Sequence, residues 1–394
     1  MLIIARNSQK MNLTQKYPEA KRIVFFVGFG IEKDGHRGIC GPEKRFLQMC
    51  HMVQSKTILP IVVYPYCGRL FTDFQKLSQD KKIVLIAYEP KSRWQYFKTV
   101  YQALKHYSPH AIHCQGGHLF DLITSVLGKW MQVQIIITRP VNVSQDYIRP
   151  FKKLIYYSID LIVARNARHL IAISNTHKKQ WCEELSLMSS RQSRKIKVIY
   201  NGIFLNQFFQ PVDRPVAPPV VFTISAQLTP VKGHALLLSV VHLLKKEGYQ
   251  FCLNIMGDGP LKSNLVTMGD HLNISSMVRF HGHVTCVSSI LKDTHVVILP
   301  SFREGLSLAL LEGMAMGCPL IASNVGASHE LIENGKNGFL IQKKSVSDLY
   351  LAMKWFLDNP TTIEDMGKKS LEKVAKFDFF RMFDAYQKLY IDSE

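Results

Sequence analysis

Short apolar runs alternate with amphipathic stretches along the whole chain. In the first half, runs rich in β-branched residues occupy positions 22–30, 83–90, 111–114, 134–138, 169–174 and 197–202. In the second half, similar runs occupy positions 220–225, 251–257, 278–282, 295–300, 319–323 and 338–341. Helical patterns separate them, and Pro42 suits the first turn of one such helix. Strands that alternate with helices form parallel sheets. The pattern predicts an α/β fold with two doubly wound parallel-sheet domains.

Proline content and charge divide the chain into parts. A proline-rich stretch at 210–220 is typical of a linker between domains. Residues 1–200 carry 31 Lys and Arg against 12 Asp and Glu, whereas residues 201–394 carry 18 of each, so the net charge of +19 lies in the first half. We predict a basic domain over 1–203, a linker over 204–219, a second domain over 220–375 and a C-terminal helix over 376–394. A basic half favours an anionic partner.

Composition excludes several classes of protein. The eight cysteines are scattered without a C-x-x-C pair, which indicates reduced thiols rather than disulfides or a zinc site. The first residues lack the apolar core of a signal peptide, and no apolar run reaches the ~18 residues of a spanning helix. We therefore expect a cytoplasmic location.

The segment 301–340 carries the strongest chemical pattern. Glu304 follows an apolar strand, and Glu312 lies eight positions later, two turns into the predicted helix. Gly305 allows the backbone to approach a ligand closely. Ligands of open α/β sheets bind beyond the carboxyl ends of strands, and helix N-termini attract phosphate. The alternative interpretation is an ordinary strand and helix with solvated glutamates.

The same segment resembles the E-x7-E pattern of the retaining glycosyltransferases with two Rossmann-like domains, the GT-B architecture. Strand, E-G-L-x-L, helix, G-x-P-x-I-A-S strand and G-x-x-x-E helix follow in the family's order. The resemblance implies two Rossmann-like domains facing a cleft, with the last helix crossing back to the first domain. It implies that Glu304 stabilises charge at the donor sugar's anomeric carbon and that Glu312 binds the nucleotide ribose. The amides of Gly305, Leu306 and Ser307 would face the diphosphate.

A second motif, at 224–244, resembles the family's diphosphate loop, G-R-L-x-x-x-K-G. Lys232 matches the phosphate-binding lysine, whereas Gln227 stands in place of the arginine. In the first half, Cys40-Gly41-Pro42-Glu43 resembles the glycine loop G-G-x-E, so Gly41 would let the backbone approach donor or acceptor.

The family's H-x-H element is only partly present. The second histidine is Gln115 in the simplest register, and His118, which follows two glycines, is the alternative residue to line the site. A structural role for His118 stays open. Glu330 is either a capping carboxylate or a functional one.

The resemblance implies a hexosyltransferase that needs no metal or other cofactor. The donor would be a UDP- or GDP-sugar, and the acceptor a glycan or lipid-linked hydroxyl in surface polysaccharide or lipopolysaccharide synthesis. The basic half adds an anionic membrane as a partner, at the cytoplasmic face of the inner membrane, and no nucleic-acid motif is present. The helix predicted at 147–170, rich in basic and aromatic residues, is either membrane-interfacial or ordinary. Two other functions stay open: a sugar-nucleotide epimerase of the same architecture, and a non-catalytic protein that binds anionic polymers.

Overall fold

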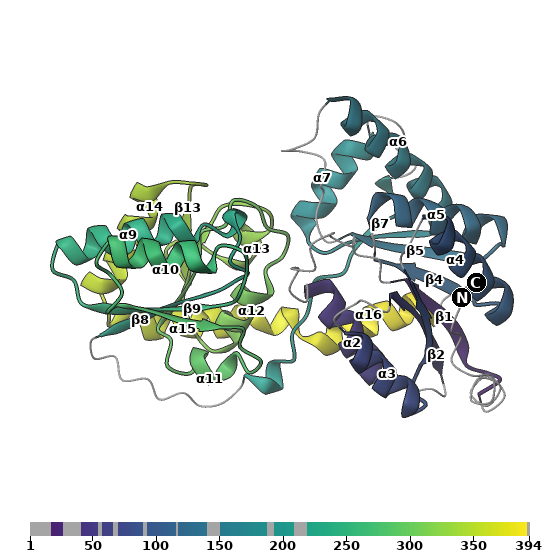
Figure 1. Ribbon diagram of the computed structural model, residues 1–394, viewed down its shortest axis with the longest axis horizontal. Coiled ribbons are helices and arrows are strands. Elements are labelled where there is room, and N and C mark those ends of the chain that lie inside the picture. Colours follow the sequence, from purple (N-terminus) through teal and green to yellow (C-terminus); the bar gives the residue numbers. More distant parts are fainter. Residues whose placement is uncertain are drawn as a thin grey trace. The chain divides into compact units, whose positions relative to one another are not determined.

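A computed structural model describes residues 17–26, 41–53, 57–65, 70–89, 93–115, 117–139, 150–186, 193–208 and 219–391. The chain forms two compact units (Figure 1). The first comprises residues 1–173, 177–199 and 383–394, and the second comprises residues 174–176 and 200–382.

The first unit contains a seven-stranded parallel sheet in the order β3-β2-β1-β4-β5-β6-β7. Its strands are β1 (Lys21–Phe26), β2 (Ile58–Pro65), β3 (Val84–Tyr88), β4 (Ala111–Cys114), β5 (Gln134–Arg139), β6 (His169–Ala172) and β7 (Ile196–Val198). Its helices are α2 (Gly41–Met52), α3 (Phe71–Gln79), α4 (Arg93–Tyr107), α5 (His118–Trp130), α6 (Pro150–Asn166) and α7 (Asn175–Ser186).

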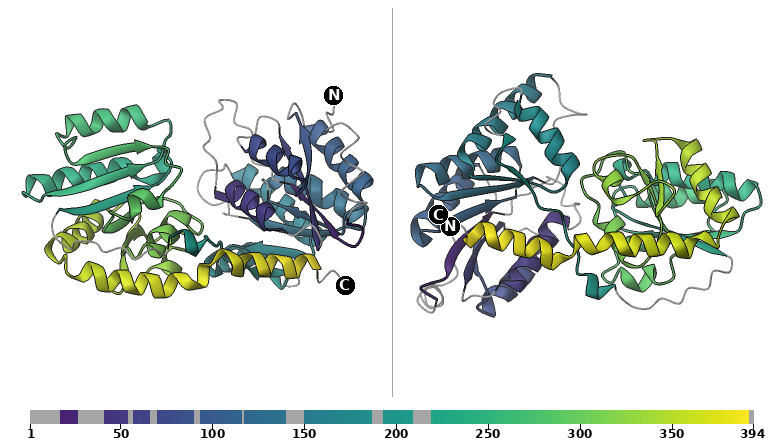
Figure 2. Two further views of the ribbon diagram at one scale, coloured as in Figure 1. Left: turned by 90° about the horizontal axis from the view of Figure 1, so that it is seen from below. Right: turned by 180° about the vertical axis from the view of Figure 1, so that it is seen from behind.

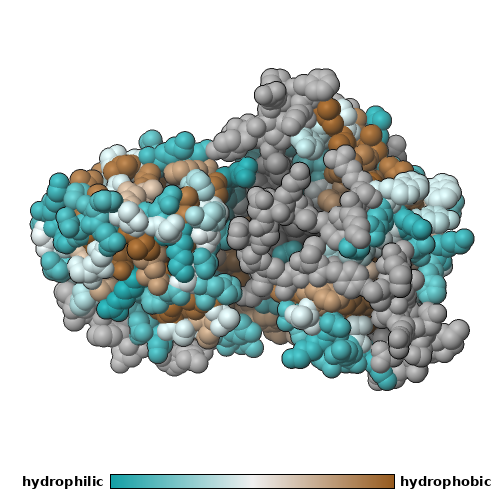
Figure 3. Space-filling view, in the orientation of Figure 1, coloured by the Kyte–Doolittle hydropathy of each residue, from teal (hydrophilic) through white to brown (hydrophobic). Residues whose placement is uncertain are grey.

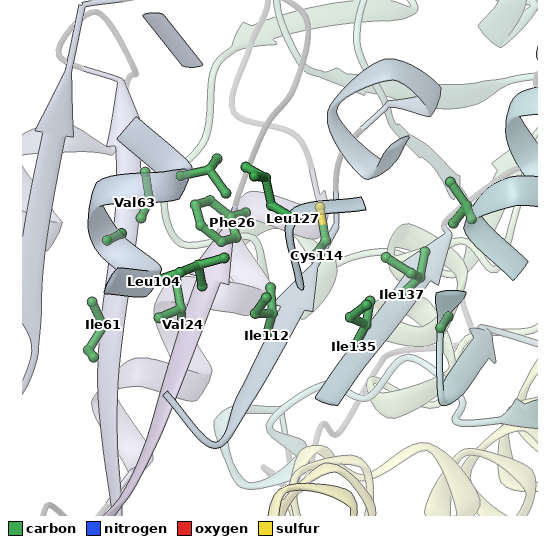
Figure 4. Packing of buried hydrophobic residues seen from close by; sticks show 14 of the residues in the cluster. Val24, Phe26, Ile61, Val63, Leu104, Ile112, Cys114, Leu127, Ile135 and Ile137 are labelled. Atoms are coloured by element: carbon green, nitrogen blue, oxygen red, sulfur yellow. The ribbon is translucent and has the colours of Figure 1, made fainter. Parts of the chain in front are cut away.

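Helices cover both faces of this sheet, which explains why its strands are continuously apolar rather than alternating. One face packs against α4 and α5 through a buried cluster (Figure 4) that includes Val24, Phe26, Ile61, Val63, Leu104, Ile112, Cys114, Leu127, Ile135 and Ile137. On the other face, the ring of Phe25 packs edge-on against Phe46 of α2 at a centroid distance of 4.6 Å.

Strand β2 was not among the strands that the apolar pattern predicts. It lies between β1 and β3, where Pro60 pairs in register with Ile23. Proline lacks the N–H that a central strand normally donates, so Pro60 and Pro65 argue against a strand at the level of sequence. The buried apolar residues between the prolines outweigh that loss.

The second unit contains a six-stranded parallel sheet in the order β10-β9-β8-β11-β12-β13. Its strands are β8 (Val220–Ser225), β9 (Phe251–Met256), β10 (Val278–Gly282), β11 (Val296–Leu299), β12 (Leu320–Ser323) and β13 (Gly338–Ile341). Its helices are η1 (Leu205–Gln207), η2 (Pro230–Lys232), α9 (His234–Lys246), α10 (Lys262–His271), α11 (Ser288–Leu291), α12 (Leu308–Ala315), α13 (Ser328–Leu331), α14 (Val346–Asp358), α15 (Thr362–Val374) and η3 (Ala375–Phe377).

The last helix, α16 (Phe379–Ile391), begins in the second unit, and its residues from 383 onward belong to the first. Figure 2 shows its final turns, in yellow, against the sheet of the first unit. The hydroxyl of Tyr390 lies 2.7 Å from Nδ1 of His113, and Nε2 of that histidine lies 2.8 Å from Oγ1 of Thr138. The α/β fold class with two doubly wound parallel sheets is thus confirmed. Among the described residues, no helix combines the length and apolar character needed to cross a bilayer.

Candidate functional site

The candidate site of the second unit lies where its strand order reverses. From β8 the chain builds outward through β9 and β10, then returns to place β11 on the other side of β8. In open α/β sheets, ligands bind beyond the carboxyl ends of the strands at such a reversal. Residues 226–233 follow β8, and residues 300–307 follow β11.

Lys232 and Glu304, one from each of these loops, form an ion pair. Nζ of Lys232 lies 2.6 Å from Oε1 of Glu304, and the two side chains are 23% and 11% exposed. A second contact joins the loops, since the amide of Phe302 donates to the carbonyl of Val231 at 2.7 Å. The two charged groups singled out from separate motifs are therefore neighbours.

Two glycines make this close approach of backbones possible. Gly233 has a φ of 75°, and a Cβ there would lie 2.2 Å from the carbonyl oxygen of Pro300. Gly326, in the loop after β12, has a φ of 55°, and a Cβ there would lie 2.1 Å from the carbonyl oxygen of Glu304. Any side chain at either position would push the loops apart.

Helix α12 begins at Leu308, shortly after Glu304 and Gly305. Ser307 is its N-cap, and its hydroxyl accepts a hydrogen bond from the amide of Leu310 at 3.4 Å. The side chain of Leu306 is 5% exposed and holds the turn in the core. This helix end is therefore built as a small site of positive potential.

Glu312 and Gln227 flank the same edge. Glu312 is half-buried in the second turn of α12, and Gln227 is exposed in the loop after β8. Gly41, from the first unit, is the first residue of α2, and the loop before it (27–40) lies outside the described residues.

Glu330 has a structural role in the second unit. Its carboxylate accepts hydrogen bonds from the amides of Asn175 (3.2 Å) and Thr176 (2.7 Å) and from the hydroxyl of Tyr200 (2.7 Å). Burial disfavours its charged form, but these bonds outweigh it and lower its pKa. The capping interpretation fits these hydrogen bonds, because Asn175 and Thr176 belong to the second unit as well.

In the first unit, His113 in β4, Gln115 just after it and His118 at the start of α5 have different surroundings. His113 is fully buried between Tyr390 and Thr138, and burial lowers its pKa to about 3, so it is a neutral structural residue. The side chain of Gln115 is 3% exposed at the end of β4. His118 is the first residue of α5, and its Nδ1 lies 2.6 Å from Oδ1 of Asp160 in α6.

A buried charge network that the sequence did not reveal holds His118. The other carboxylate oxygen of Asp160 lies 2.5 Å from Nη1 of Arg139, whose Nε lies 3.5 Å from Asp121. Burial opposes ionisation of Asp160, but Arg139 and the hydrogen bond from His118 outweigh it and lower its pKa. Burial prevails at Asp121 and raises its pKa, although Arg139 acts in the opposite direction.

Packing surrounds this network on both sides. The guanidinium of Arg139 lies 5.4 Å from the ring centroid of Trp181, and the thiol of Cys114 donates to Asp121 at 3.1 Å. The ring of Tyr156 lies 4.7 Å from the ring of His118. Because Nδ1 of His118 is engaged by Asp160, its Nε2 is the atom available to a ligand. Within the described ranges, no three His, Cys, Asp or Glu side chains gather as metal ligands would.

Comparisons with known proteins agree with this architecture. Residues 207–373 match the family model of glycosyl transferases group 1. The chain is 26% identical over 253 residues to the UDP-Gal:alpha-D-GlcNAc-diphosphoundecaprenol alpha-1,3-galactosyltransferase of Escherichia coli, which covers 61% of this chain and 64% of that protein. It is 27% identical over 153 residues to the poly(ribitol-phosphate) alpha-N-acetylglucosaminyltransferase of Staphylococcus aureus (strain COL), which covers 38% of this chain and 31% of that protein. The matched stretches thus span 64% or less of these relatives' own length.

A solved structure matches over nearly the whole chain. Anabaena Alr3699/HepE in complex with UDP-glucose aligns with a TM-score of 0.75 at 18% identity, covering 94% of this chain and 99% of that one. This likeness shows the fold. The match over residues 207–373 confirms, for this part of the chain, the resemblance to the group 1 glycosyltransferases that the sequence predicts.

Proposed function

We propose that this chain is a retaining glycosyltransferase that moves a hexose from a UDP- or GDP-sugar to a hydroxyl of a glycan or lipid-linked acceptor. The observation that carries the proposal is the Lys232–Glu304 pair, 2.6 Å apart at the reversal of strand order and directly before the N-terminus of α12. A cation, a carboxylate and a helix N-terminus in one place suit a sugar diphosphate, which has an anionic part and a hydroxylated part.

In the proposed reaction, the acceptor oxygen bonds to the anomeric carbon on the face from which the diphosphate leaves. The acceptor proton passes to the departing phosphate oxygen, so that no basic side chain is required. Lys232 and the amides of Gly305, Leu306 and Ser307 offset the charge that grows on the diphosphate. These groups supply the positive charge, and we therefore propose a reaction without a metal ion.

The ion pair itself would change partners when the donor binds. In the structure, Lys232 and Glu304 satisfy each other. A diphosphate would draw Lys232 away and leave the carboxylate of Glu304 to face the sugar and its anomeric carbon. Glu312 would accept hydrogen bonds from the ribose, and the exposed amide of Gln227 would donate to phosphate without adding charge.

In the first unit, we propose that Nε2 of His118 contacts the donor sugar and that Gly41 lies against donor or acceptor. Gln115 is the weaker candidate, because its side chain is almost fully buried.

The acceptor class follows from charge and from the relatives. The first half of the chain carries the whole net charge of +19. The two relatives are named for acceptors that contain phosphate, a diphosphoundecaprenol and a poly(ribitol-phosphate). We propose a phosphate-bearing, lipid-linked or polymeric acceptor at the cytoplasmic face of the inner membrane, in surface polysaccharide assembly.

A thermal-shift panel of UDP, GDP, ADP and their sugar conjugates tests the donor site. A ligand at 100 times its Kd stabilises the folded state by about 2.7 kcal/mol. We expect one nucleotide to raise the Tm of the wild type and of the control Glu364→Ala, an exposed glutamate of α15, but not of Glu312→Ala or Lys232→Met. If no nucleotide raises the Tm of the wild type, the donor site is wrong and the polymer-binding alternative takes its place.

Product analysis separates transfer from epimerisation. A transferase releases the nucleoside diphosphate only when an acceptor is present, apart from slow hydrolysis, and Glu304→Gln should reduce kcat/KM at least 100-fold. Conversion of the nucleotide sugar into its epimer without acceptor would instead identify an epimerase.

A further inference from the structure

The first unit contains a pocket of about 630 Å³ that the donor site does not use. Its lining comes from the residues just before β4, β5, β6 and β7 and from the last turns of α5 and α6. It therefore lies at the amino-terminal edge of the sheet, opposite the edge where β4 and β5 lead to His118 and Arg139. Four cations line it: Lys129, Arg165, Arg168 and Lys195. None of the described lining residues is acidic.

The negative C-terminal ends of the helices neutralise only part of this positive charge. Nζ of Lys195 donates to the carbonyls of Ala164 and Ala167 at 3.1 and 2.9 Å and so caps the end of α6. Two helix C-termini carry a combined charge of about −1, which is less than the charge of Lys129 and Arg165 alone. His110, also in the lining, has a pKa lowered by burial and then by Arg22 and Lys21, which agrees with a positive local potential.

An exposed aromatic and apolar surface adjoins the pocket. Trp130 follows Lys129 at the end of α5, is 69% exposed, and stacks on Tyr101 at a centroid distance of 5.9 Å. Val126 of α5 and Ile162 of α6 are 45% and 41% exposed. Figure 3 shows hydrophobic residues gathered over α6. An indole at the boundary between apolar and charged groups is typical of proteins that sit at lipid head groups.

The exposed apolar side chains of α6 are not the aromatic residues that the sequence pattern singled out. The hydroxyl of Tyr157 donates to the carbonyl of Glu184, and Tyr156 packs on His118, so both tyrosines contact their own unit. The exposed side chains are instead Leu154 and Ile155, which are 60% and 45% exposed.

We propose that this pocket and Trp130 form a docking surface for an anionic membrane, with lipid phosphates in the pocket and the indole among the head groups. The bilayer is the favoured source of phosphate because a soluble anion would leave Trp130 and Ile162 in water. The assignment does not depend on sugar transfer. It gives the basic half of the chain a specific place of contact.

Co-sedimentation of the full chain with vesicles tests the surface. The wild type should bind vesicles of equal phosphatidylglycerol and phosphatidylcholine at low salt, and should not bind phosphatidylcholine alone. Each cation near an anionic surface contributes about fivefold, so Lys129→Gln with Arg165→Gln should weaken binding about 25-fold. The control, Lys246→Gln with Lys292→Gln in the second unit, has the same net charge and should bind within twofold of wild type.

Tryptophan fluorescence reports the aromatic part. Vesicles should shift the emission to shorter wavelength in the wild type, and the shift should disappear in Trp130→Phe, which keeps Trp94, Trp181 and Trp355. The Lys129→Gln, Arg165→Gln double variant and Trp130→Phe change exposed residues. Both should keep the wild-type Tm and its response to UDP or GDP. A failure of docking is thereby distinguished from a failure of the donor site.

Three results would overturn the proposal. The first is vesicle binding that the pocket variant and the control variant weaken equally. The second is no vesicle binding together with a pocket-dependent rise in Tm with inorganic pyrophosphate, which would assign the pocket to a soluble phosphate ligand. The third is pocket-dependent retention of an oligonucleotide without vesicle binding, which would assign the surface to nucleic acid.

Discussion

The charge network around Arg139 determines how His118 presents its ring. One guanidinium faces two carboxylates, and the pKa directions of those carboxylates differ: burial raises that of Asp121, whereas Arg139 and His118 lower that of Asp160. Asp160 is therefore the carboxylate whose charged form its surroundings favour. It positions His118 by accepting a hydrogen bond from Nδ1–H. The lone pair of the neutral ring is then on Nε2.

Asp160→Asn should therefore impair transfer through His118. We expect kcat/KM to fall 10- to 100-fold, as when the partner of a functional histidine is lost. His118→Ala should lower kcat/KM at least as much. Adding Asp160→Asn to it should lower kcat/KM little further, because the two residues act as one unit. Steady-state kinetics on the three variants measure this cycle.

Stability must be followed in the same variants. Loss of one partner of a buried pair destabilises by about 3–5 kcal/mol, and Asp121 next to Arg139 should reduce that cost. The exposed Asp73→Asn is the matched control and should change neither kcat/KM nor the free energy of unfolding. Strictly additive losses in the double variant would show that Asp160 does not act through His118.

The sequence identified His118 but not its partners, for a physical reason. Asp160 lies 42 residues away, and only the packing of α5 against α6 brings it to His118. Lys232 and Glu304 were predicted as candidates because each belongs to a local motif with a loop and a helix start. Their mutual contact, in contrast, depends on the order of β8 and β11 in the sheet.

At the scale of elements, α16 is held to the first unit by hydrogen bonds that end on β4 and β5. Tyr390 bonds His113, and Tyr386 bonds Thr138 at 3.1 Å. Tyr390→Phe removes one hydroxyl and leaves a buried ring nitrogen without its partner. An unsatisfied buried polar atom costs about 1–3 kcal/mol, so we expect the free energy of unfolding to fall by that amount.

Urea unfolding of Tyr390→Phe and of a control measures the effect. The control is Tyr249→Phe, whose hydroxyl bonds Asp358 at 2.6 Å on the surface and should change stability by less than 0.5 kcal/mol. Equal effects of the two substitutions would mean that the contact with His113 does not stabilise the docking of α16.

Apolar periodicity predicted the elements of the second unit well, because each strand there is a short apolar run next to a glycine or a polar turn. It failed at β2, where Pro60 and Pro65 obscured a central strand. Periodicity also could not show where α16 docks. That choice depends on His113 and on Phe25, whose ring lies 5.7 Å from that of Tyr390.

At the scale of the whole molecule, buried neutral histidines occur in both units. Burial lowers the pKa of His113 to about 3, burial followed by Arg139 lowers that of His177 to about 4, and burial followed by Lys232 lowers that of His234 to about 4. The unfolded chain protonates these groups near pH 6.5. Below that pH, the unfolded state binds more protons than the folded state, so stability present above pH 6.5 is lost as the pH falls towards 4.

Each of these groups contributes a slope of up to about 1.4 kcal/mol per pH unit, or about 4 kcal/mol for the three together. With a total stability of about 5–15 kcal/mol, the protein should lose a large part of its stability before pH 4. His234→Leu tests the origin of the slope. Both ring nitrogens of His234 lack a hydrogen-bond partner among the described residues, so leucine removes the titration without removing a bond.

We expect His234→Leu to keep or exceed wild-type stability at pH 7 and to remove, between pH 6 and 4.5, about a third of the slope that His113, His177 and His234 contribute together. Urea unfolding at half-unit pH intervals measures it, with the exposed His283→Gln as the control. An unchanged slope in His234→Leu would mean that His234 does not contribute to the acid sensitivity. A pair such as Asp160 and Arg139, whose carboxylate has a lowered pKa, loses its contribution only as the pH falls below about 4. The pH at which stability declines therefore separates the two sources.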